Sequence, residues 1–331
     1  MCACDPAELV VIVPAHHDAG RRAWLRLDRL RPLVDCLRSL QAAVDQWRAG
    51  TGLAFDGVRI VLVDDGSPVE LATLLPPDVA ASVDVLRLDS RRGQGAALNA
   101  ALRTHRAGAY AFTDSDCVVA PDWITTIEKL AASDDGTDGA AGPPWPHRRP
   151  GSRKAAWLTR QETALIRHCT DRALRHGAAA RLDCRNVWLR AGVAGKLGRQ
   201  GFFPEDAGAA LSGITSRLME SAGVRLGFDP GLVVRHQPVT SVRAVARTYF
   251  RRGATSDLDR HYAAGYPSLA GAFVSTYARR HFVEPVRSGV SPAYVLLAHG
   301  AYWCGLARRT RRRGRSSAGR RRRRQTVERL P

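Results

Sequence analysis

The stretch VRIVLVDDGS, residues 58–67, decides the fold class. Its first six residues form an apolar run with one interruption, which is typical of a buried strand, and the acidic residues and glycine that follow predict a turn. Similar apolar runs cover residues 9–14, 83–88 and 109–113, with helix-like patterns at roughly 33–48, 95–106 and 121–132 between them. Strands that alternate with helices predict an α/β fold with a mostly parallel sheet flanked by helices.

Polar side chains follow three of these strands. They are His16, His17 and Asp18 after the first, Asp64 and Asp65 after the second, and Asp114 and Asp116 after the fourth. Open α/β sheets bind ligands at the carboxyl ends of their strands. One such group alone is explained by turn formation or helix capping, but three groups favour a binding crevice.

Asp114 and Asp116 lie two residues apart, on the same side of an extended chain. Carboxylate oxygens hold Mg²⁺ or Mn²⁺ well when substrate phosphates complete the coordination shell. The chain lacks a P-loop, and Arg92-Gly-Gln-Gly95 does not match the dinucleotide-binding glycine fingerprint. Both of those nucleotide-binding classes are therefore disfavoured.

Five segments, in order over about residues 9–253, resemble the family 2 glycosyltransferases. They are Val13 to Asp18, Val63 to Ser67, Arg92 to Asn99, Phe112 to Asp116 with Pro121, and Glu205-Asp206 with Gly223 and His236. The resemblance implies the GT-A fold, a Rossmann-like mixed sheet. It also implies inverting transfer of a sugar from a nucleoside-diphosphate donor, a UDP- or GDP-sugar, to an acceptor hydroxyl that the sequence does not identify. The QxxRW motif of processive synthases is absent, which favours the addition of one sugar.

The resemblance also implies roles for individual residues. The donor-binding set is Pro14, Ala15, Asp18, Asp64, Asp65, Arg92, Asn99, Asp114, Arg251 and Arg252, with Asp65 at the base edge and the last two screening the diphosphate. Asp116, Asp114 and His236 would hold Mn²⁺ or Mg²⁺. Asp206 matches the general base, with Glu205 as the alternative. Two further alternatives stay open: a structural role for His236 and a turn-orienting role for Asp64.

The basic charge is concentrated at the C-terminal end. The formal net charge is +19, and residues 308–331 hold twelve arginines against one glutamate. We expect a GT-A domain over 1–255, a helical extension over 256–307 and a disordered basic tail over 308–331. A tail of this kind after Tyr294, Tyr302 and Trp303 predicts contact with an anionic membrane surface. A solvated tail is the first alternative, and nucleic-acid binding, which no motif supports, is the second.

Cysteine usage and hydropathy indicate the compartment. Seven scattered cysteines without a CxxC pair predict neither a disulfide framework nor a zinc site. No signal peptide is visible, and the longest apolar stretch, 293–307, is shorter than the ~20 residues of a membrane span. We expect a cytoplasmic protein, peripheral at the inner face of the plasma membrane. Two rival functions are a sugar nucleotidylyltransferase, whose glycine-rich signature is missing, and a non-catalytic binding protein that acts through its tail.

Overall fold

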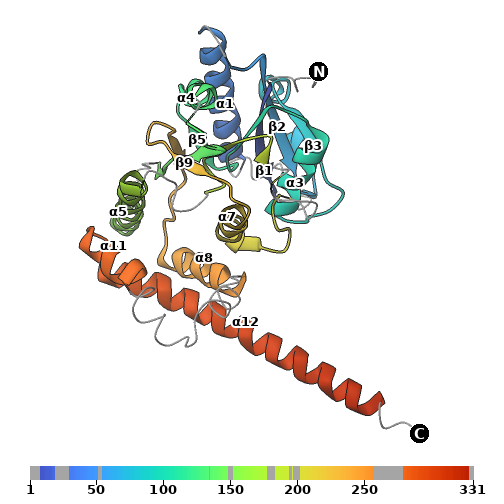
Figure 1. Ribbon diagram of the computed structural model, residues 1–331, viewed down its shortest axis with the longest axis vertical. Coiled ribbons are helices and arrows are strands. Elements are labelled where there is room, and N and C mark those ends of the chain that lie inside the picture. Colours follow the sequence, from blue (N-terminus) through green and yellow to red (C-terminus); the bar gives the residue numbers. More distant parts are fainter. Residues whose placement is uncertain are drawn as a thin grey trace. The chain divides into compact units, whose positions relative to one another are not determined.

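The chain forms two compact units in the computed structural model, which describes residues 8–18, 30–50, 54–133, 135–147, 152–176, 183–193, 196, 202–255 and 279–327 (Figure 1). The first unit consists of residues 1–151, 162–206 and 211–238. The second consists of residues 152–161, 207–210 and 239–331. The domain boundaries expected from the sequence differ from this division, because residues 239–255 group with the C-terminal helices.

A seven-stranded sheet forms the centre of the first unit, in the order β3-β2-β1-β4-β8-β6-β9. The strands are β1 (Glu8–Ala15), β2 (Gly57–Asp64), β3 (Asp84–Arg87), β4 (Ala109–Phe112), β6 (Gly139–Ala141), β8 (Val187–Arg190) and β9 (Leu226–Phe228). Strands β1 to β4 pair in parallel, whereas β8 is antiparallel to both of its neighbours, β4 and β6. The predicted mixed, mostly parallel sheet is confirmed.

Helices cover both faces of this sheet. They are α1 (Arg31–Arg48), α3 (Gln94–Thr104) and α4 (Trp123–Ala132), all close to their predicted positions. Val11 of β1 shares one buried core with Leu37 of α1 and Ile124 of α4. Val10 and Ile12 alternate to the opposite face, where α3 packs (Figure 1). Shorter helices are η2 (Leu71–Leu74) and α2 (Pro77–Ala80), and α7 (Leu211–Ser221) follows later in the chain.

A second sheet of three strands begins directly after Asp116. Its order is β5-β10-β7, with β5 (Cys117–Val119), β10 (Val234–His236) and β7 (Pro144–Pro146). Strand β10 is antiparallel to β5, and His236 lies opposite Cys117. This pairing brings His236 next to the end of β4, although more than a hundred residues separate the two segments.

The Gly/Pro-rich segment 134–153, which reads as a long loop, contains β6 and β7. That prediction is wrong for residues 139–141 and 144–146. These strands are three residues long and rich in Gly, Ala and Pro, so they show neither alternation nor β-branched residues. A side chain at Gly139 would overlap the backbone of Trp188, so tertiary contact with β8 selects glycine there.

The second unit is helical. It contains α8 (Val242–Thr255), η5 (Arg279–Val283), α11 (Glu284–Arg287), α12 (Pro292–Val327) and the short turn η3 (Gly208–Ala210). Helices α8 and α12 touch through two glycines, because a side chain at Gly253 would overlap Tyr302 and one at Gly305 would overlap Phe250. Helix α5 (Arg153–His176) begins in this unit and ends in the first.

Helix α12 continues to Val327, into the residues of the expected basic tail. Arginine is a good helix former, so a block of arginines can extend a helix that packing has already started. The part of the predicted extension at 256–278 lies outside the described residues. No helix in the described ranges combines the length and apolar character that crossing a membrane requires.

Candidate active site

The turns after β1 and β2 are joined by hydrogen bonds into one surface at the end of the sheet. The backbone N–H of Asp65 donates to the carbonyl of Ala15, the last residue of β1, at 2.9 Å. The His16 imidazole lies 2.8 Å from the carbonyl oxygen of Asp65, and the N–H of His17 donates to Ser67 Oγ at 3.0 Å. These hydrogen bonds therefore hold the two turns together.

Asp64 is fully buried and holds the turn after β2. Its carboxylate accepts the backbone N–H groups of Ser67 at 2.9 Å and Leu71 at 3.1 Å, and Arg87 donates to the same carboxylate at 2.5 Å. The carboxylate has no exposed surface and accepts from all three of these groups. Asp64 therefore orients the turn, which agrees with the turn-orienting alternative, and its predicted contact with the donor stays a prediction.

Asp65 organises the approach to α3. Its two carboxylate oxygens accept the backbone N–H groups of Arg92 at 2.7 Å and Gly93 at 2.8 Å. Gly93 has a φ of +95°, a conformation that favours glycine. The predicted contact of Asp65 with a nucleobase stays a prediction, and the side chain also fixes the position of Arg92.

Asp18 is exposed at the rim of this surface. It lies 2.7 Å from His16 Nε2 and accepts a hydrogen bond of 3.2 Å from Arg91. The hydrogen bond from His16 and the charge of Arg91 hold the pKa of Asp18 below its usual value. Since the carbonyl of Asp65 and the carboxylate of Asp18 can only accept, both bonds to His16 form when the imidazole carries two protons.

Asp114 and Asp116 lie together at the end of β4. Gln94, the first residue of α3, donates to Asp114 Oδ1 at 2.6 Å. Burial, with the charges of Asp116 and Asp183, raises the pKa of Asp114 to about 7, against the opposing charge of Arg185. Loss of surrounding water also raises the pKa of Asp116, although its side chain is exposed at the surface. Two crowded carboxylates of this kind are stabilised by a cation.

The residues at the end of β4 fit a divalent cation that a substrate helps to hold. No three acidic, histidine or cysteine side chains within the described ranges form a ready metal cluster. Two carboxylates with several positions left to phosphate oxygens and water are, however, the usual protein contribution to Mg²⁺ binding. The two carboxylates are therefore suited to a cation that binds together with a phosphate.

The interaction partners of His236 are residues other than Asp114 and Asp116. Its side chain is buried, its Nδ1 donates to the carbonyl of Gln237 at 2.9 Å, and its Nε2 lies 3.3 Å from the carboxylate of Glu162. It does not form a three-ligand cluster with Asp114 and Asp116 in the described part of the chain. The arrangement favours the structural alternative for His236 over its predicted role as a metal ligand.

Asn99 positions the segment that carries the predicted base. Its amide donates to the carbonyl of Phe203 at 2.7 Å and accepts the N–H of Phe203 at 2.9 Å. A longer bond of 3.3 Å reaches Glu205. Asn99 is buried and both ends of its amide are used, so it positions the segment at Phe203 and Glu205. Its predicted contact with the donor stays a prediction.

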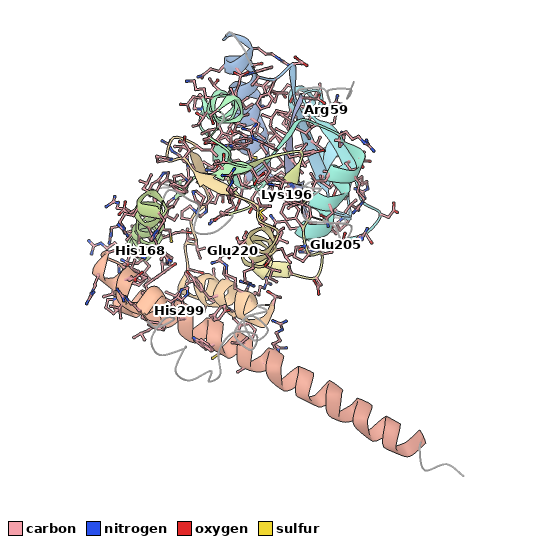
Figure 2. The ribbon with its side chains drawn as sticks, in the orientation of Figure 1. Arg59, His168, Lys196, Glu205, Glu220 and His299 are labelled. Atoms are coloured by element: carbon pink, nitrogen blue, oxygen red, sulfur yellow. The ribbon has the colours of Figure 1, made fainter. Side chains whose placement is uncertain are left out.

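Glu205 and Asp206 have different surroundings. Glu205, labelled in Figure 2, accepts a hydrogen bond of 2.7 Å from Arg92 and lies 3.8 Å from Arg103. Asp206 is exposed, and no hydrogen bond or ion pair joins it to another residue that the structure describes. Its carboxylate is therefore the one that is open to a substrate, and Arg92 is engaged with Glu205.

The remaining predicted residues are Pro14 and Ala15, which end β1, and Arg251 and Arg252, which lie on α8 of the second unit. The guanidinium of Arg252 lies over the ring of Tyr249, 5.3 Å from its centroid. The proposed contact of Arg251 and Arg252 with a diphosphate stays a prediction.

A sequence profile described as "Glycosyl transferase family 2" matches residues 11–182, which is more than half of the 331 residues. The chain belongs to glycosyl transferase family 2. The protein is therefore a glycosyltransferase, and the nucleotidylyltransferase alternative is set aside.

The glycosyltransferase also resembles solved structures. The mannosyltransferase PcManGT from Pyrobaculum calidifontis, in complex with GDP-Man and Mn²⁺, has 17% identity and a TM-score of 0.52, over 91% of this chain and 90% of that one. TarS from S. aureus has 14% identity and a TM-score of 0.45, over 91% of this chain and 54% of that one. The first likeness supports the GT-A fold. None of the curated proteins matches the chain.

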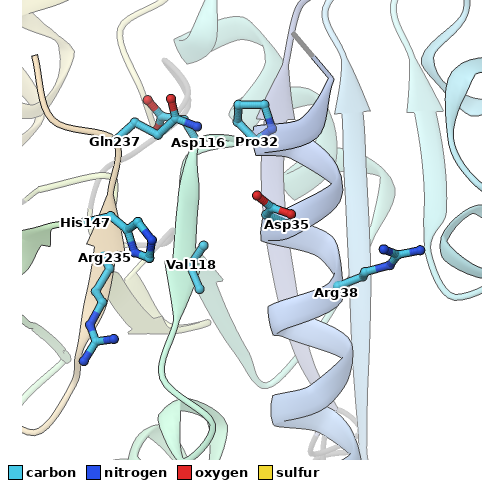
Figure 3. A pocket seen from close by; sticks show the side chains of 8 residues that line it. All are labelled: Pro32, Asp35, Arg38, Asp116, Val118, His147, Arg235 and Gln237. Carbon is cyan, nitrogen blue, oxygen red and sulfur yellow. The ribbon is translucent and has the colours of Figure 1, made fainter. Parts of the chain in front are cut away.

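A pocket of about 270 Å³ adjoins Asp116 in the glycosyltransferase, between α1 and the second sheet (Figure 3). Its lining residues are Pro32, Asp35, Arg38, Asp116, Val118, His147, Arg235 and Gln237. Pockets for ligands of drug size usually measure about 300–1,000 Å³. The pocket lies below that range and contains none of the groups at the ends of β1 and β2, so it is not a complete nucleotide-sugar site.

Proposed function

We propose that this glycosyltransferase moves one sugar from a nucleoside-diphosphate sugar to an acceptor hydroxyl, with inversion, and that Asp116 and Asp114 hold Mn²⁺ or Mg²⁺. The observation that carries the proposal is the position of these two carboxylates together at the end of β4, where burial and then the charge of Asp116 raise the pKa of Asp114 to about 7. The complex of PcManGT with GDP-Man and Mn²⁺ is consistent with this donor class.

The donor would occupy the ends of β1 and β2. Asp18, exposed and held by His16 and Arg91, is placed to accept hydrogen bonds from a sugar or base. Asp65 and the backbone at Pro14 and Ala15 form the floor beside it. When bound, a divalent cation neutralises the charge that develops on the leaving diphosphate.

Asp206 supplies the general base in this proposal. As the acceptor oxygen forms its bond to the anomeric carbon, the bond from that carbon to the diphosphate oxygen breaks. The proton of the acceptor hydroxyl passes to the Asp206 carboxylate, which has no partner among the described residues to compete for it. A single displacement of this kind inverts the anomeric configuration.

Asp116→Asn tests the metal assignment. We expect turnover of UDP- and GDP-sugars to be lost, together with the Mn²⁺ dependence of UDP or GDP binding measured by calorimetry, while circular dichroism stays unchanged. Asp56→Asn is a matched control, because Asp56 is exposed and precedes β2 at the opposite end of the strand from Asp64. Full Mn²⁺-stimulated turnover in Asp116→Asn would refute the assignment.

A further inference from the structure

Arg185 lies at the same end of the sheet as Asp114. Strand β8 runs antiparallel to β4, with Val187 opposite Phe112. Arg185 precedes Val187 by two residues, and Asp114 follows Phe112 by two. The register therefore places both residues just beyond the same end of the strand pair, on opposite strands.

The Arg185 side chain is fixed along one edge. Its Nε donates to Asp183 Oδ1 at 2.9 Å and its Nη2 to Asp183 Oδ2 at 2.7 Å. A guanidinium has five N–H donors. The remaining three have no acceptor among the described residues, and the side chain is 22% exposed. Arg185 thus presents an open edge of N–H donors that none of the described residues uses.

Electrostatics agrees with this placement. Burial raises the pKa of both Asp114 and Asp116, and the charge of Arg185 opposes that rise, as expected for a guanidinium at this end of the strand pair. Burial lowers the pKa of Arg185 itself, but the charges of Asp183 and Asp114 outweigh burial and raise it. The group is therefore a permanent cation beside the predicted metal site.

We propose that Arg185 binds a phosphate oxygen of the donor diphosphate. The inference rests on the proposed function, which brings that diphosphate to Asp114 and Asp116. The open edge of a guanidinium fork matches the spacing of phosphate oxygens, and a fork already held by a carboxylate loses little freedom on binding. Three carboxylates face this one arginine, so the anion enters with a divalent cation and Arg185 acts only when Mn²⁺ or Mg²⁺ is present.

Calorimetry on the full chain tests this assignment with UDP and GDP, and with uridine and guanosine as probes that lack the diphosphate. In the presence of Mn²⁺, Arg185→Gln should weaken binding of the preferred nucleoside diphosphate about tenfold or more, as expected for a lost charge-assisted hydrogen bond. Affinity for the nucleoside should not change. Arg185→Lys keeps the charge but not the planar guanidinium fork, so its affinity for the nucleoside diphosphate should fall several-fold.

Arg190→Gln is the matched control. Arg190 ends the same strand at its other end, where it donates to the carbonyls of Thr137 at 3.1 Å and Ser133 at 3.0 Å. This change should leave the affinity for the diphosphate intact. If Arg185→Gln does not fold, Arg185→Lys carries the test.

Unchanged nucleoside diphosphate affinity in folded Arg185 variants would overturn the inference and leave the proposed function standing. An equal loss of affinity for the nucleoside and the nucleoside diphosphate would also overturn the inference, because that result would show a structural role for Arg185. If the wild-type protein binds neither UDP nor GDP with Mn²⁺, the proposed function fails and this inference fails with it.

Discussion

At the residue scale, Asp206 and Glu205 are neighbours whose partners give them different chemistry. Both side chains are exposed, but Glu205 is engaged by Arg92 at 2.7 Å and by Asn99 at 3.3 Å, whereas Asp206 has no hydrogen bond or ion pair with another described residue. Asp206→Asn removes the proton acceptor with little change in shape, so the turnover rate should fall about 10²–10⁴-fold. Donor and Mn²⁺ affinity should stay within about threefold, because the partner of a general base is the acceptor hydroxyl.

The matched variant Glu205→Gln breaks the ion pair with Arg92 and keeps Asp206. Turnover and calorimetric donor binding, measured on both variants, decide between the two carboxylates. If Asp206→Asn loses donor binding while Glu205→Gln shows the large loss of rate, the base is Glu205.

The motifs predicted the location of the site residues better than they predicted the role of each residue. Asp64 and Asn99 lie where their motifs place them, yet both are buried and bind backbone groups of the chain itself. Arg185 belongs to none of the motifs and was not predicted. Its signal was its position two residues before an apolar strand, but its closeness to Asp114 depends on an antiparallel pairing that the sequence pattern does not specify.

At the element scale, long buried strands were predictable and short ones were not. Strands β1 and β2 have eight residues each, and the apolar runs within them, interrupted in β2 by Arg59, identify them as strands. Strands β6, β7, β9 and β10 have three residues each, and pairing with neighbours defines them more than their own composition does. The contacts of helix α8 with α12 at Gly253 and Gly305 join residues that are about fifty positions apart, so no local sequence pattern specifies them.

Helix α12 contains a histidine that should make stability depend on pH. The His299 ring lies 4.8 Å from Phe282, 5.4 Å from His281 and 6.1 Å from Tyr249, measured between centroids. Burial lowers the pKa of His299 to about 4. The neutral ring is therefore favoured in the fold, so this stabilisation is complete above about pH 6.5 and is lost as the pH falls toward 4.

The free energy of unfolding should fall by at most about 3 kcal/mol because of His299 as the pH is lowered. Urea unfolding at pH 7.5 and 5 should show a smaller pH dependence for His299→Phe than for the wild type. The control His176→Phe alters an exposed residue at the end of α5 and should retain the full dependence. Equal pH dependence in all three proteins would show that His299 is not the group responsible.

At the scale of the whole molecule, charge is the least evenly distributed property. The formal net charge is +19, and the twelve arginines and one glutamate of residues 308–331 account for more than half of it. Composition alone predicted this asymmetry. The helical state of residues up to Val327 could not be predicted, because a block of like charges is usually disordered and only its attachment to α12 provides a helix to continue.

Contact of this tail with anionic membranes stays a prediction. Each basic residue near an anionic surface contributes about 1 kcal/mol, so a tail with twelve arginines should dominate binding at low salt. Deleting residues 308–331 should release the protein from phosphatidylserine vesicles in a sedimentation assay. Hydrolysis of the nucleotide-sugar in solution should change little.

Replacing the five arginines at 320–324 with glutamine keeps the tail length and should weaken vesicle binding in part. High salt should weaken wild-type binding in the same way, because it screens exposed charges. Binding that resists salt and survives the deletion would contradict the electrostatic prediction, and a loss of binding to RNA rather than to vesicles would indicate the nucleic-acid alternative.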